Sequence, residues 1–312
     1  MQAPPPPNHD SAKAATAWGL LAIVVWSTTI ACSRSVAEQV GVFTGAAAVY
    51  LAAGIVGCGV LIGRGQLGSV LRHSGRPYLF GCGSLMVAYT VLLYAAVGFA
   101  ETRSQVITVT VANYLWPSLT LLFAVPILGW QARPLVLAIG TLLGVSGVAL
   151  AVGGDSLASD ASLAWTAHAT STLPALAAAV AWGLYSNLSR RWGGQQAGNA
   201  MPVFLLASGL VLLLVRAFRA EPSVWTARVA GEVAYMMLFP TLLAYVCWDS
   251  AARRGNLSLV AALSYLTPLL SVAVSSLYLD LPVRPQQWFS GVLVVAGAVL
   301  CKISIRAEGS EC

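Results

Sequence analysis

The chain has 312 residues, of which 58% are hydrophobic and only 9% are charged, with a net charge of +6. An ordinary soluble domain carries roughly 25% charged residues, so a soluble fold of this size would lack polar surface. The basic residues stand singly or in pairs between apolar runs, which argues against nucleic acid as a partner. The composition therefore predicts an all-α polytopic membrane protein, whose outer surface can be apolar because it faces lipid.

The apolar residues fall into ten stretches of about 20 residues, the length that crosses a bilayer as a helix. Residues 1–15 precede them and contain a run of four prolines (4–7), which indicates a disordered tail. Because so many apolar stretches follow, the first of them is interpreted as a helix and not as a signal peptide. The predicted spans are 16–35, 42–62, 77–98, 105–128, 135–153, 172–191, 200–219, 231–251, 257–279 and 287–305.

The connections between spans are mostly short, which predicts that neighbouring helices are antiparallel and side by side. A polar segment at 154–171 separates five spans from five. We therefore expect one five-helix repeat at 16–153, an external linker, a second repeat at 172–305 and a short tail at 306–312.

The distribution of Lys and Arg predicts the orientation, because cytoplasmic loops are enriched in both. If both termini are cytoplasmic, eleven basic residues face the cytoplasm and six face the other side. The eleven are Lys13, Arg64, Arg72, Arg76, Arg133, Arg190, Arg191, Arg253, Arg254, Lys302 and Arg306. A cluster of Arg216, Arg219 and Arg228 runs against this assignment.

Aromatic, proline and arginine residues recur at fixed offsets between the two halves, which predicts an internal duplication. At an offset of 156, Trp26 matches Trp182. At an offset of 151 the matches include Tyr94 with Tyr245, Tyr114 with Tyr265, Pro117 with Pro268, Arg133 with Arg284 and Gly140 with Gly291. Each half has an odd number of spans, so the second is expected to be inverted relative to the first. Inverted repeats are typical of secondary transporters, which hold substrate near the bilayer midplane.

Charged residues are placed at the ends of the predicted spans, in loops or in the tails. This placement argues against a buried proton-binding carboxylate and against a buried basic site for phosphorylated substrates. The sequence also lacks a Ser-His-Asp set, metal-ligand spacing and a phosphate-binding loop. We therefore expect neither an enzyme nor a bound metal or cofactor.

Aromatic and weakly polar residues occupy the middle of the spans, and we expect them to line a central substrate site. The candidates are Trp26, Tyr89, Tyr94, Asn113, Trp116, Trp182, Tyr185, Tyr245, Trp248 and Ser264. The alternative is structural, because Ser and Thr join membrane helices and Trp and Tyr mark the headgroup belt. Trp116 and Trp182 lie too deep in their spans for that belt.

Pro117 and Pro268 are predicted to kink the fourth and ninth spans, because a proline within a helix removes one backbone hydrogen bond. The carbonyl groups set free would be those of Asn113 and Ser264, and a free carbonyl at membrane depth needs a cavity or another partner. Such carbonyls could bind an ammonium group, and the aromatic faces could stack on an apolar side chain.

Glycines in the fifth and tenth spans predict close helix packing instead of a transport path. Gly140 and Gly144 are separated by three residues, the spacing at which neighbouring helices approach closely. Gly291 and Gly297 are expected to act similarly in the tenth span.

Three runs of residues resemble the aromatic amino acid exporters of YddG type, in the EamA branch of the drug/metabolite transporter superfamily. They are Ala-Ile-Val-Val-Trp-Ser-Thr (22–28), Ala-Asn-Tyr-Leu-Trp-Pro-Ser-Leu-Thr (112–120) and Gly-Gly-Asp (153–155). The resemblance extends from about 16 to 305, and its matching site positions are Tyr89, Trp116 and Trp182.

This resemblance implies ten helices in an inverted five-plus-five repeat, with both termini cytoplasmic. It also implies a central cavity lined by spans one, three, four, six, eight and nine. The implied activity is export of Phe, Tyr, Trp and other neutral amino acids across the bacterial inner membrane by alternating access. The partners would be the amino acid substrate and membrane lipid.

Two other functions stay open at this point: a multidrug or metabolite exporter of the same superfamily, and a membrane-embedded enzyme acting on lipids. A cation pump would be expected to bury a carboxylate, and a lipid enzyme would need catalytic polar groups at one membrane face. The sequence leaves open the substrate range, the coupling to protons and the oligomeric state, a monomer being compatible with it.

Overall fold

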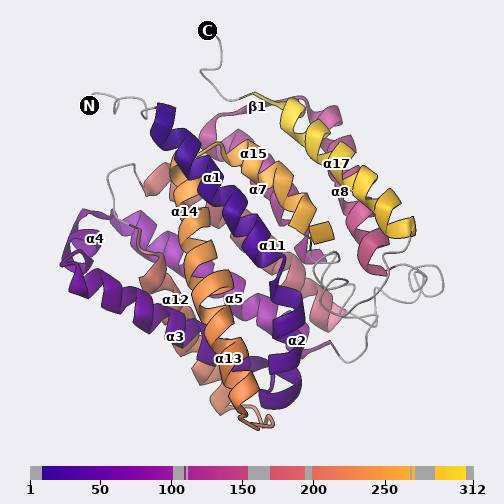
Figure 1. The fold of residues 1–312 in the computed structure, drawn as a ribbon. Helices are drawn as coiled ribbons and strands as arrows, with labels where there is room; N and C mark the ends of the chain where they lie inside the picture. Colours follow the sequence, from indigo (N-terminus) through magenta and orange to yellow (C-terminus); the bar gives the residue numbers. More distant parts are fainter. Residues whose placement is uncertain are drawn as a thin grey trace.

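The computed structural model describes residues 9–100, 109, 112–153, 169–193, 199–267, 269–270 and 285–306, which are almost entirely helical. Figure 1 shows the arrangement. The elements of the first half are α1 (His9–Trp26), α2 (Thr29–Val40), α3 (Val42–Gly63), α4 (Leu67–His73), η1 (Pro77–Cys82), α5 (Gly83–Gly98), α7 (Trp116–Leu128), β1 (Gln131–Ala132) and α8 (Pro134–Gly153). Those of the second half are α11 (Ala169–Trp192), α12 (Met201–Ala217), α13 (Ala227–Met236), η3 (Met237–Leu243), α14 (Ala244–Arg254), α15 (Leu257–Leu263), η4 (Ser264–Leu266), α17 (Pro285–Ser304) and β2 (Ile305–Arg306).

Some of the helices have the length that a bilayer requires, and the molecule has an apolar outer surface. Among the described residues, three helices are long and apolar enough to cross a membrane: Val42–Gly63, Pro77–Gly98 and Ala227–Arg254. Shorter apolar helices, such as Met201–Ala217, accompany them. Large apolar side chains point outwards, as at Leu142 and Val292, which are 66% and 65% exposed.

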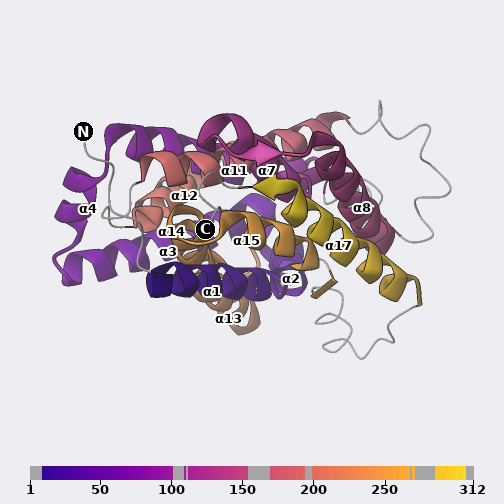
Figure 2. The same ribbon diagram turned by 90° about the horizontal axis from the view of Figure 1, so that it is seen from above.

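The helices of the two halves pack against one another in pairs. Helix α3 packs on α12, α5 on α11, and α1 on α14. Helices α8 and α17 form a separate pair at one side of the molecule, as Figure 2 shows from above. Their ends are joined by the two-residue strands β1 and β2, in which Gln131 pairs with Arg306.

Contacts between connections show which helix ends lie together. The Asn256 backbone N–H donates to Thr16 Oγ1 at 2.9 Å, and Arg190 donates to the Gly255 carbonyl at 2.8 Å. The start of α1, the end of α11 and the α14–α15 connection therefore share one end of the molecule. We call it the basic end, because Lys13, Arg190 and Arg254 line a cavity there.

At the opposite end, the Glu221 carboxylate accepts hydrogen bonds from the backbone N–H groups of Phe43 and Thr44 at 2.9 and 2.8 Å. Glu221 also pairs with Arg216 at 3.6 Å, and Glu232 pairs with Arg228 at 3.1 Å. Two arginines of the cluster that ran against the predicted orientation therefore have local acidic partners.

The first predicted span is broken into two helices. Helix α1 ends at Trp26 and α2 begins at Thr29. The reason lies in Ser27 and Thr28, whose hydroxyls donate to the carbonyls of Val24 at 2.5 Å and Val25 at 2.8 Å. Such side chain–backbone bonds compete with the helix and interrupt it here without changing the hydropathy of the segment.

The fourth predicted span is interrupted just ahead of Pro117, where the sequence predicted a kink. Residues 114–115 form a turn, and α7 begins at Trp116 with Pro117 in its first turn. A proline is well tolerated there because the first turn needs no backbone N–H donor. In the ninth span, α15 gives way to the 3₁₀ turn η4, and Pro268 lies outside the described residues.

Glycines mark the close crossing of α8 and α17. A Cβ atom added at Gly140 would lie 2.8 Å from the backbone nitrogen of Cys301, and one at Gly144 would lie 3.0 Å from the Tyr265 ring. A Cβ atom at Gly291, by contrast, would meet the Leu269 side chain at 3.6 Å and no other described residue within 4 Å. Of the two glycines expected to pack closely in the tenth span, Gly297 does so, because it faces the backbone of Gly144.

We expect Gly54→Ala to destabilise the protein, while Gly59→Ala on the same helix should not. A Cβ atom at Gly54 would overlap the backbone of Leu206 in α12, whereas at Gly59 no atom of the described part of the chain lies within 4 Å. Overpacking costs about 1–3 kcal/mol, and a helical glycine in open space gains up to about 1 kcal/mol as alanine. Melting temperatures of both variants in detergent check this, and equal values would contradict the close crossing.

Candidate functional site

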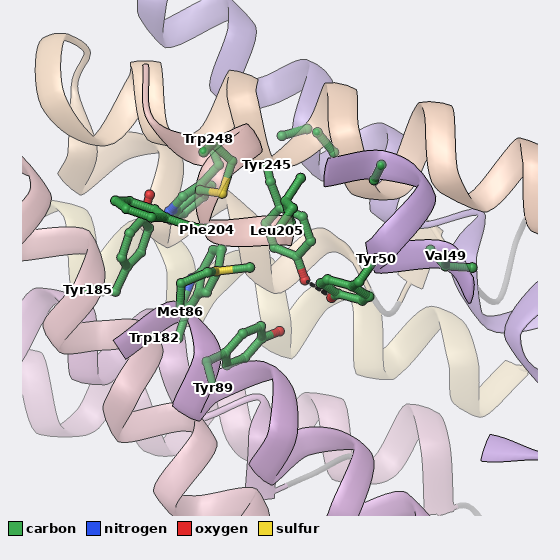
Figure 3. Packing of buried hydrophobic residues seen from close by; sticks show 14 of the residues in the cluster. Val49, Tyr50, Met86, Tyr89, Trp182, Tyr185, Phe204, Leu205, Tyr245 and Trp248 are labelled. Atoms are coloured by element: carbon green, nitrogen blue, oxygen red, sulfur yellow. Dashed lines mark hydrogen bonds between the residues drawn. The ribbon is translucent and has the colours of Figure 1, made fainter. Parts of the chain in front are cut away.

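A cluster of aromatic side chains fills the middle of the helix bundle around Trp182. The ring centroid of Trp182 lies 4.6 Å from that of Tyr89, 5.5 Å from that of Tyr245 and 5.6 Å from that of Trp26. Figure 3 shows Trp182, Tyr89, Tyr245 and neighbouring side chains. The members of this aromatic cluster are Trp26, Tyr89, Trp116, Trp182, Tyr185, Tyr245 and Trp248.

The cluster is assembled from α1, α5, α7, α11 and α14, so that both halves of the chain contribute rings. Trp182 is 2% exposed and Trp248 is fully buried. Trp116 lies 5.0 Å from Trp248 in an edge-on arrangement. Seven of the ten candidate site residues from the sequence are thus brought together in one cluster.

Tyr50 joins an eighth candidate, Tyr94, to this cluster, and the sequence interpretation missed it. Its ring centroid lies 5.9 Å from that of Tyr94, and its hydroxyl lies 2.8 Å from the hydroxyl of Tyr245. Tyr50 lies near the middle of α3, and a tyrosine in the middle of a predicted span could have identified it as a candidate.

The other two candidates lie outside these ring contacts. The Ser264 hydroxyl is buried and donates to the carbonyl of Val260 on its own helix at 2.8 Å. Asn113 is half-buried and directly precedes the turn that leads into α7.

Hydrogen bonds hold the indole rings in place. Trp26 Nε1 donates to the carbonyl of Pro240 at 2.9 Å, within the π-helical segment η3. Trp248 Nε1 donates to Ser186 Oγ at 3.1 Å. Trp182 Nε1 is buried and has no hydrogen-bond partner among the described residues. A buried donor without an acceptor is costly, so this N–H is suited to an acceptor that a ligand would bring.

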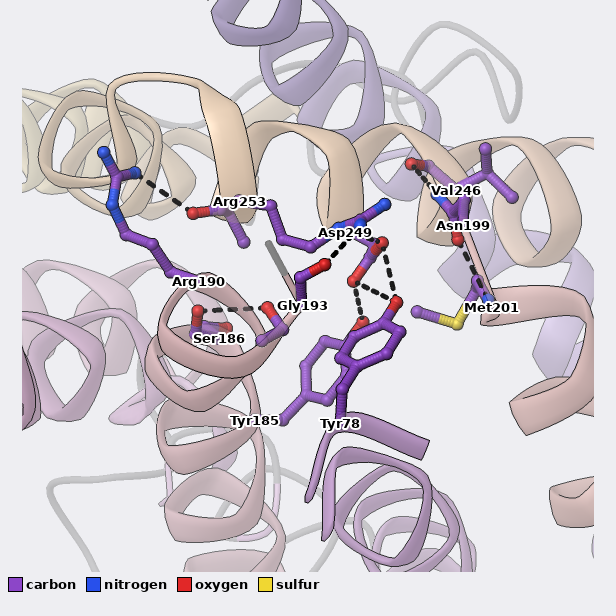
Figure 4. A network of polar contacts seen from close by, with 12 residues as sticks. Tyr78, Tyr185, Ser186, Arg190, Gly193, Asn199, Met201, Val246, Asp249 and Arg253 are labelled. Atoms are coloured by element: carbon purple, nitrogen blue, oxygen red, sulfur yellow. Dashed lines mark hydrogen bonds and ion pairs between the residues drawn. The ribbon is translucent and has the colours of Figure 1, made fainter. Parts of the chain in front are cut away.

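A buried ion pair adjoins the aromatic cluster on the side of the basic end (Figure 4). Arg253 Nε lies 2.9 Å from Asp249 Oδ2, one helical turn away on α14, and the two side chains are 1% and 0% exposed. The expectation that no carboxylate is buried is therefore wrong for Asp249. It was placed near the end of a span at 231–251, but the helix continues to Arg254, and η1 and α11 cover it.

Two tyrosine hydroxyls complete the surroundings of Asp249. Tyr185 donates to Oδ1 at 2.7 Å, and Tyr78 donates to Oδ1 and Oδ2 at 3.3 and 3.2 Å. The Arg253 guanidinium lies over the Tyr78 ring, 5.4 Å from its centroid, and donates to the Gly193 carbonyl at 3.4 Å. Because Tyr78 belongs to the first half of the chain, its bonds tie the two halves together at this point.

The rings of the aromatic cluster pack on one another in this structure, and the cavities described lie elsewhere. One of about 380 Å³ is apolar and lined by Leu238, Phe239, Leu242, Leu243 and Val246. The cavity at the basic end has about 510 Å³.

Comparison with known proteins places the chain among transporters. Residues 170–302 match the EamA-like transporter family. The chain is 32% identical to the aromatic amino acid exporter YddG of Salmonella typhimurium, over 94% of this chain and 98% of that protein. It is also 27% identical to the probable terminal-alkyne amino-acid exporter of Streptantibioticus cattleyicolor, over 91% and 92% of the two chains.

The fold itself has a solved counterpart. A crystal structure with 27% sequence identity superposes with a TM-score of 0.77, covering 96% of this chain and 99% of the other. The overall arrangement is therefore shared over nearly the whole length of both proteins.

Proposed function

This chain belongs to the YddG-type exporters of the EamA-like transporter family, and we propose that it exports aromatic and other neutral amino acids through the aromatic cluster. It is a multi-pass membrane protein and a transporter, not an enzyme. The observation that carries the choice of substrate is the set of indole and phenol rings around Trp182.

The chemistry of the cluster suits an aromatic side chain. Aromatic pairs at centroid separations of about 4.5–7 Å contribute about 0.5–1.5 kcal/mol beyond the burial of their area. A Phe, Tyr or Trp substrate entering between Trp116 and Trp182 would exchange ring–ring contacts within the protein for equivalent ones with itself. The indole N–H of Trp182 would gain an acceptor from the substrate.

We further propose that two inverted five-helix repeats, at 16–153 and 172–305, alternate access to this site across the inner membrane. The pairing of helices supports this, because exchanging the halves converts the α5–α11 pair into α14–α1 and leaves α3–α12 and α8–α17 unchanged. The breaks ahead of Pro117 and at η4 also fall 151 residues apart, the offset of the sequence repeat. With both termini cytoplasmic, the basic end faces the cytoplasm.

A multidrug exporter of bulky cations is the second candidate, favoured by one observation. Trp and Tyr faces attract cations, and Asp249 supplies a buried carboxylate near them. Arg253 already compensates that charge, however, so the site as a whole offers a cation no net negative charge. An amino acid carrying both charges fits it better.

Counterflow of labelled phenylalanine into proteoliposomes, without a pH gradient, tests the proposed function. We expect saturable exchange that unlabelled Phe, Tyr and Trp inhibit and that tetraphenylphosphonium does not. Exchange that the bulky cation inhibits as strongly as these amino acids do would instead favour the multidrug exporter. Vesicles without protein give the background.

A further inference from the structure

The ion pair between Asp249 and Arg253 is poorly explained by folding alone. Both side chains are withdrawn from solvent, and removing two charges from water costs about as much as their attraction returns. Apolar residues of similar size would hold the helices at least as well. An ionisable group inside a membrane protein is therefore first considered as part of a functional site.

The position of the pair relates it to the aromatic cluster. Tyr185 connects them, because its ring lies 5.5 Å from Trp182 and its hydroxyl donates to Asp249 at 2.7 Å. Trp248, the residue before Asp249 in sequence, is itself a member of the cluster. The charged pair and the aromatic cluster thus lie next to each other, as the charged head group and the ring lie next to each other in an aromatic amino acid.

We propose that Asp249 and Arg253 bind the charged head of a zwitterionic amino acid, Arg253 taking the α-carboxylate and Asp249 the α-ammonium group. This inference rests on the proposed function and specifies its substrate class. A guanidinium binds a carboxylate through two parallel hydrogen bonds. A zwitterion carries the same two charges as the pair, so it can replace the internal ion pair without leaving either buried charge uncompensated.

Ligands with only one of these charges lack this property. An amine without a carboxylate would leave Arg253 buried and unpaired, and an acid without an ammonium group would do so to Asp249. Losing one partner of a buried, hydrogen-bonded charge pair weakens binding at least about thirtyfold. The site therefore selects for both charges at once.

Binding of the head group would also act on the hydrogen bonds that join the two halves of the chain near the basic end. Tyr78 comes from η1 and donates to both oxygens of Asp249. An α-ammonium group that takes up these oxygens competes with Tyr78 and loosens the bond between the two halves. Recognition of the substrate and opening at this end are thereby coupled through one carboxylate.

Three competitors of labelled phenylalanine counterflow test the proposal: phenylalanine, phenethylamine, which has no carboxylate, and 3-phenylpropionate, which has no ammonium group. In the wild-type protein we expect both analogues to compete at least about thirtyfold more weakly than phenylalanine. Arg253→Gln should weaken competition by phenylalanine by a similar factor, and competition by phenethylamine should stay the same or become stronger. Asp249→Asn should also weaken competition by phenylalanine, and in this variant competition by 3-phenylpropionate should stay the same or become stronger.

The matched control is Arg228→Gln, because Arg228 and Glu232 form an ion pair of the same spacing at the surface. It should leave all three competitors unchanged. If a single variant does not elute as a folded species, the double variant Asp249→Asn/Arg253→Gln is used, which should lose the preference for phenylalanine over the analogues.

The proposal is overturned if Arg253→Gln and Asp249→Asn weaken all competitors equally, or if the double variant keeps the wild-type preference. Either result would place the head group elsewhere and leave the pair a structural role. Absence of phenylalanine counterflow in the wild-type protein is a different result, since it contradicts the proposed function itself.

Discussion

Trp182→Ala is expected to lower the rate of phenylalanine counterflow at subsaturating substrate at least about tenfold. Trp182 lies at the centre of the aromatic cluster and contacts rings from α1, α5, α7 and α14. Truncating a buried Trp to alanine typically costs about 3–5 kcal/mol of packing free energy. Part of that free energy would here be lost from substrate binding, because the substrate packs on the same ring. Trp182→Phe retains a ring and should keep more activity than the alanine variant. Initial rates in proteoliposomes with equal amounts of protein give the comparison.

The control for this experiment is Trp18→Ala. Trp18 is 49% exposed on α1, so its removal should leave counterflow unchanged. If Trp182→Ala retains the wild-type rate while it elutes as a folded species, the aromatic cluster is a packing core and the substrate passes elsewhere.

Most helix boundaries were predictable from the sequence, because a span in lipid must be apolar over its whole length. The prediction of 42–62 compares with α3 at Val42–Gly63, and that of 77–98 with η1 and α5 at Pro77–Gly98. The break at 27–28 was not predictable in this way. It depends on where two hydroxyls form hydrogen bonds, and Ser and Thr are common within membrane helices without breaking them.

The aromatic part of the candidate site could be predicted because large rings lie in the middle of the predicted spans, and two of them recur at a fixed offset. Trp26 and Trp182 are equivalent at the offset of 156, and their ring centroids lie 5.6 Å apart. Trp26 and Trp182 each lie on the first helix of their half of the chain. If the two halves are equivalent, their first helices place the two rings at the same central position.

The charged part was missed because hydropathy treats a charge as the end of a span. Asp249 and Arg253 were assigned to a span end and a cytoplasmic loop, respectively. Their burial depends on Tyr78 and Tyr185, which lie more than 60 residues away in sequence (64 for Tyr185 and 171 for Tyr78). The local signal was the spacing of four residues between the acid and the base, which places both on one face of a helix.

The same pair yields the second large effect that we expect, on stability. Asp249→Ala leaves Arg253 buried without its partner, and breaking a buried ion pair from one side costs about 3–5 kcal/mol. The double variant Asp249→Asn/Arg253→Met removes both charges and keeps an acceptor for the hydroxyls of Tyr78 and Tyr185, so it should recover most of that loss. Melting temperatures and denaturant midpoints in detergent measure the cycle. Arg228→Ala, which removes a side chain that is 70% exposed in its pair with Glu232, should change stability by only about 0–1 kcal/mol.

The comparison of stability with transport then separates the two roles of the pair. A double variant as stable as the wild-type protein that no longer exchanges phenylalanine would mean that the charges are retained for the substrate's head group. A double variant as unstable as Asp249→Ala would contradict that interpretation, because the four-way arrangement of Asp249, Arg253, Tyr78 and Tyr185 would then be needed for folding. The uncharged double variant is informative for this reason: it removes recognition of both charges without creating an unpaired charge or an unpaired hydroxyl.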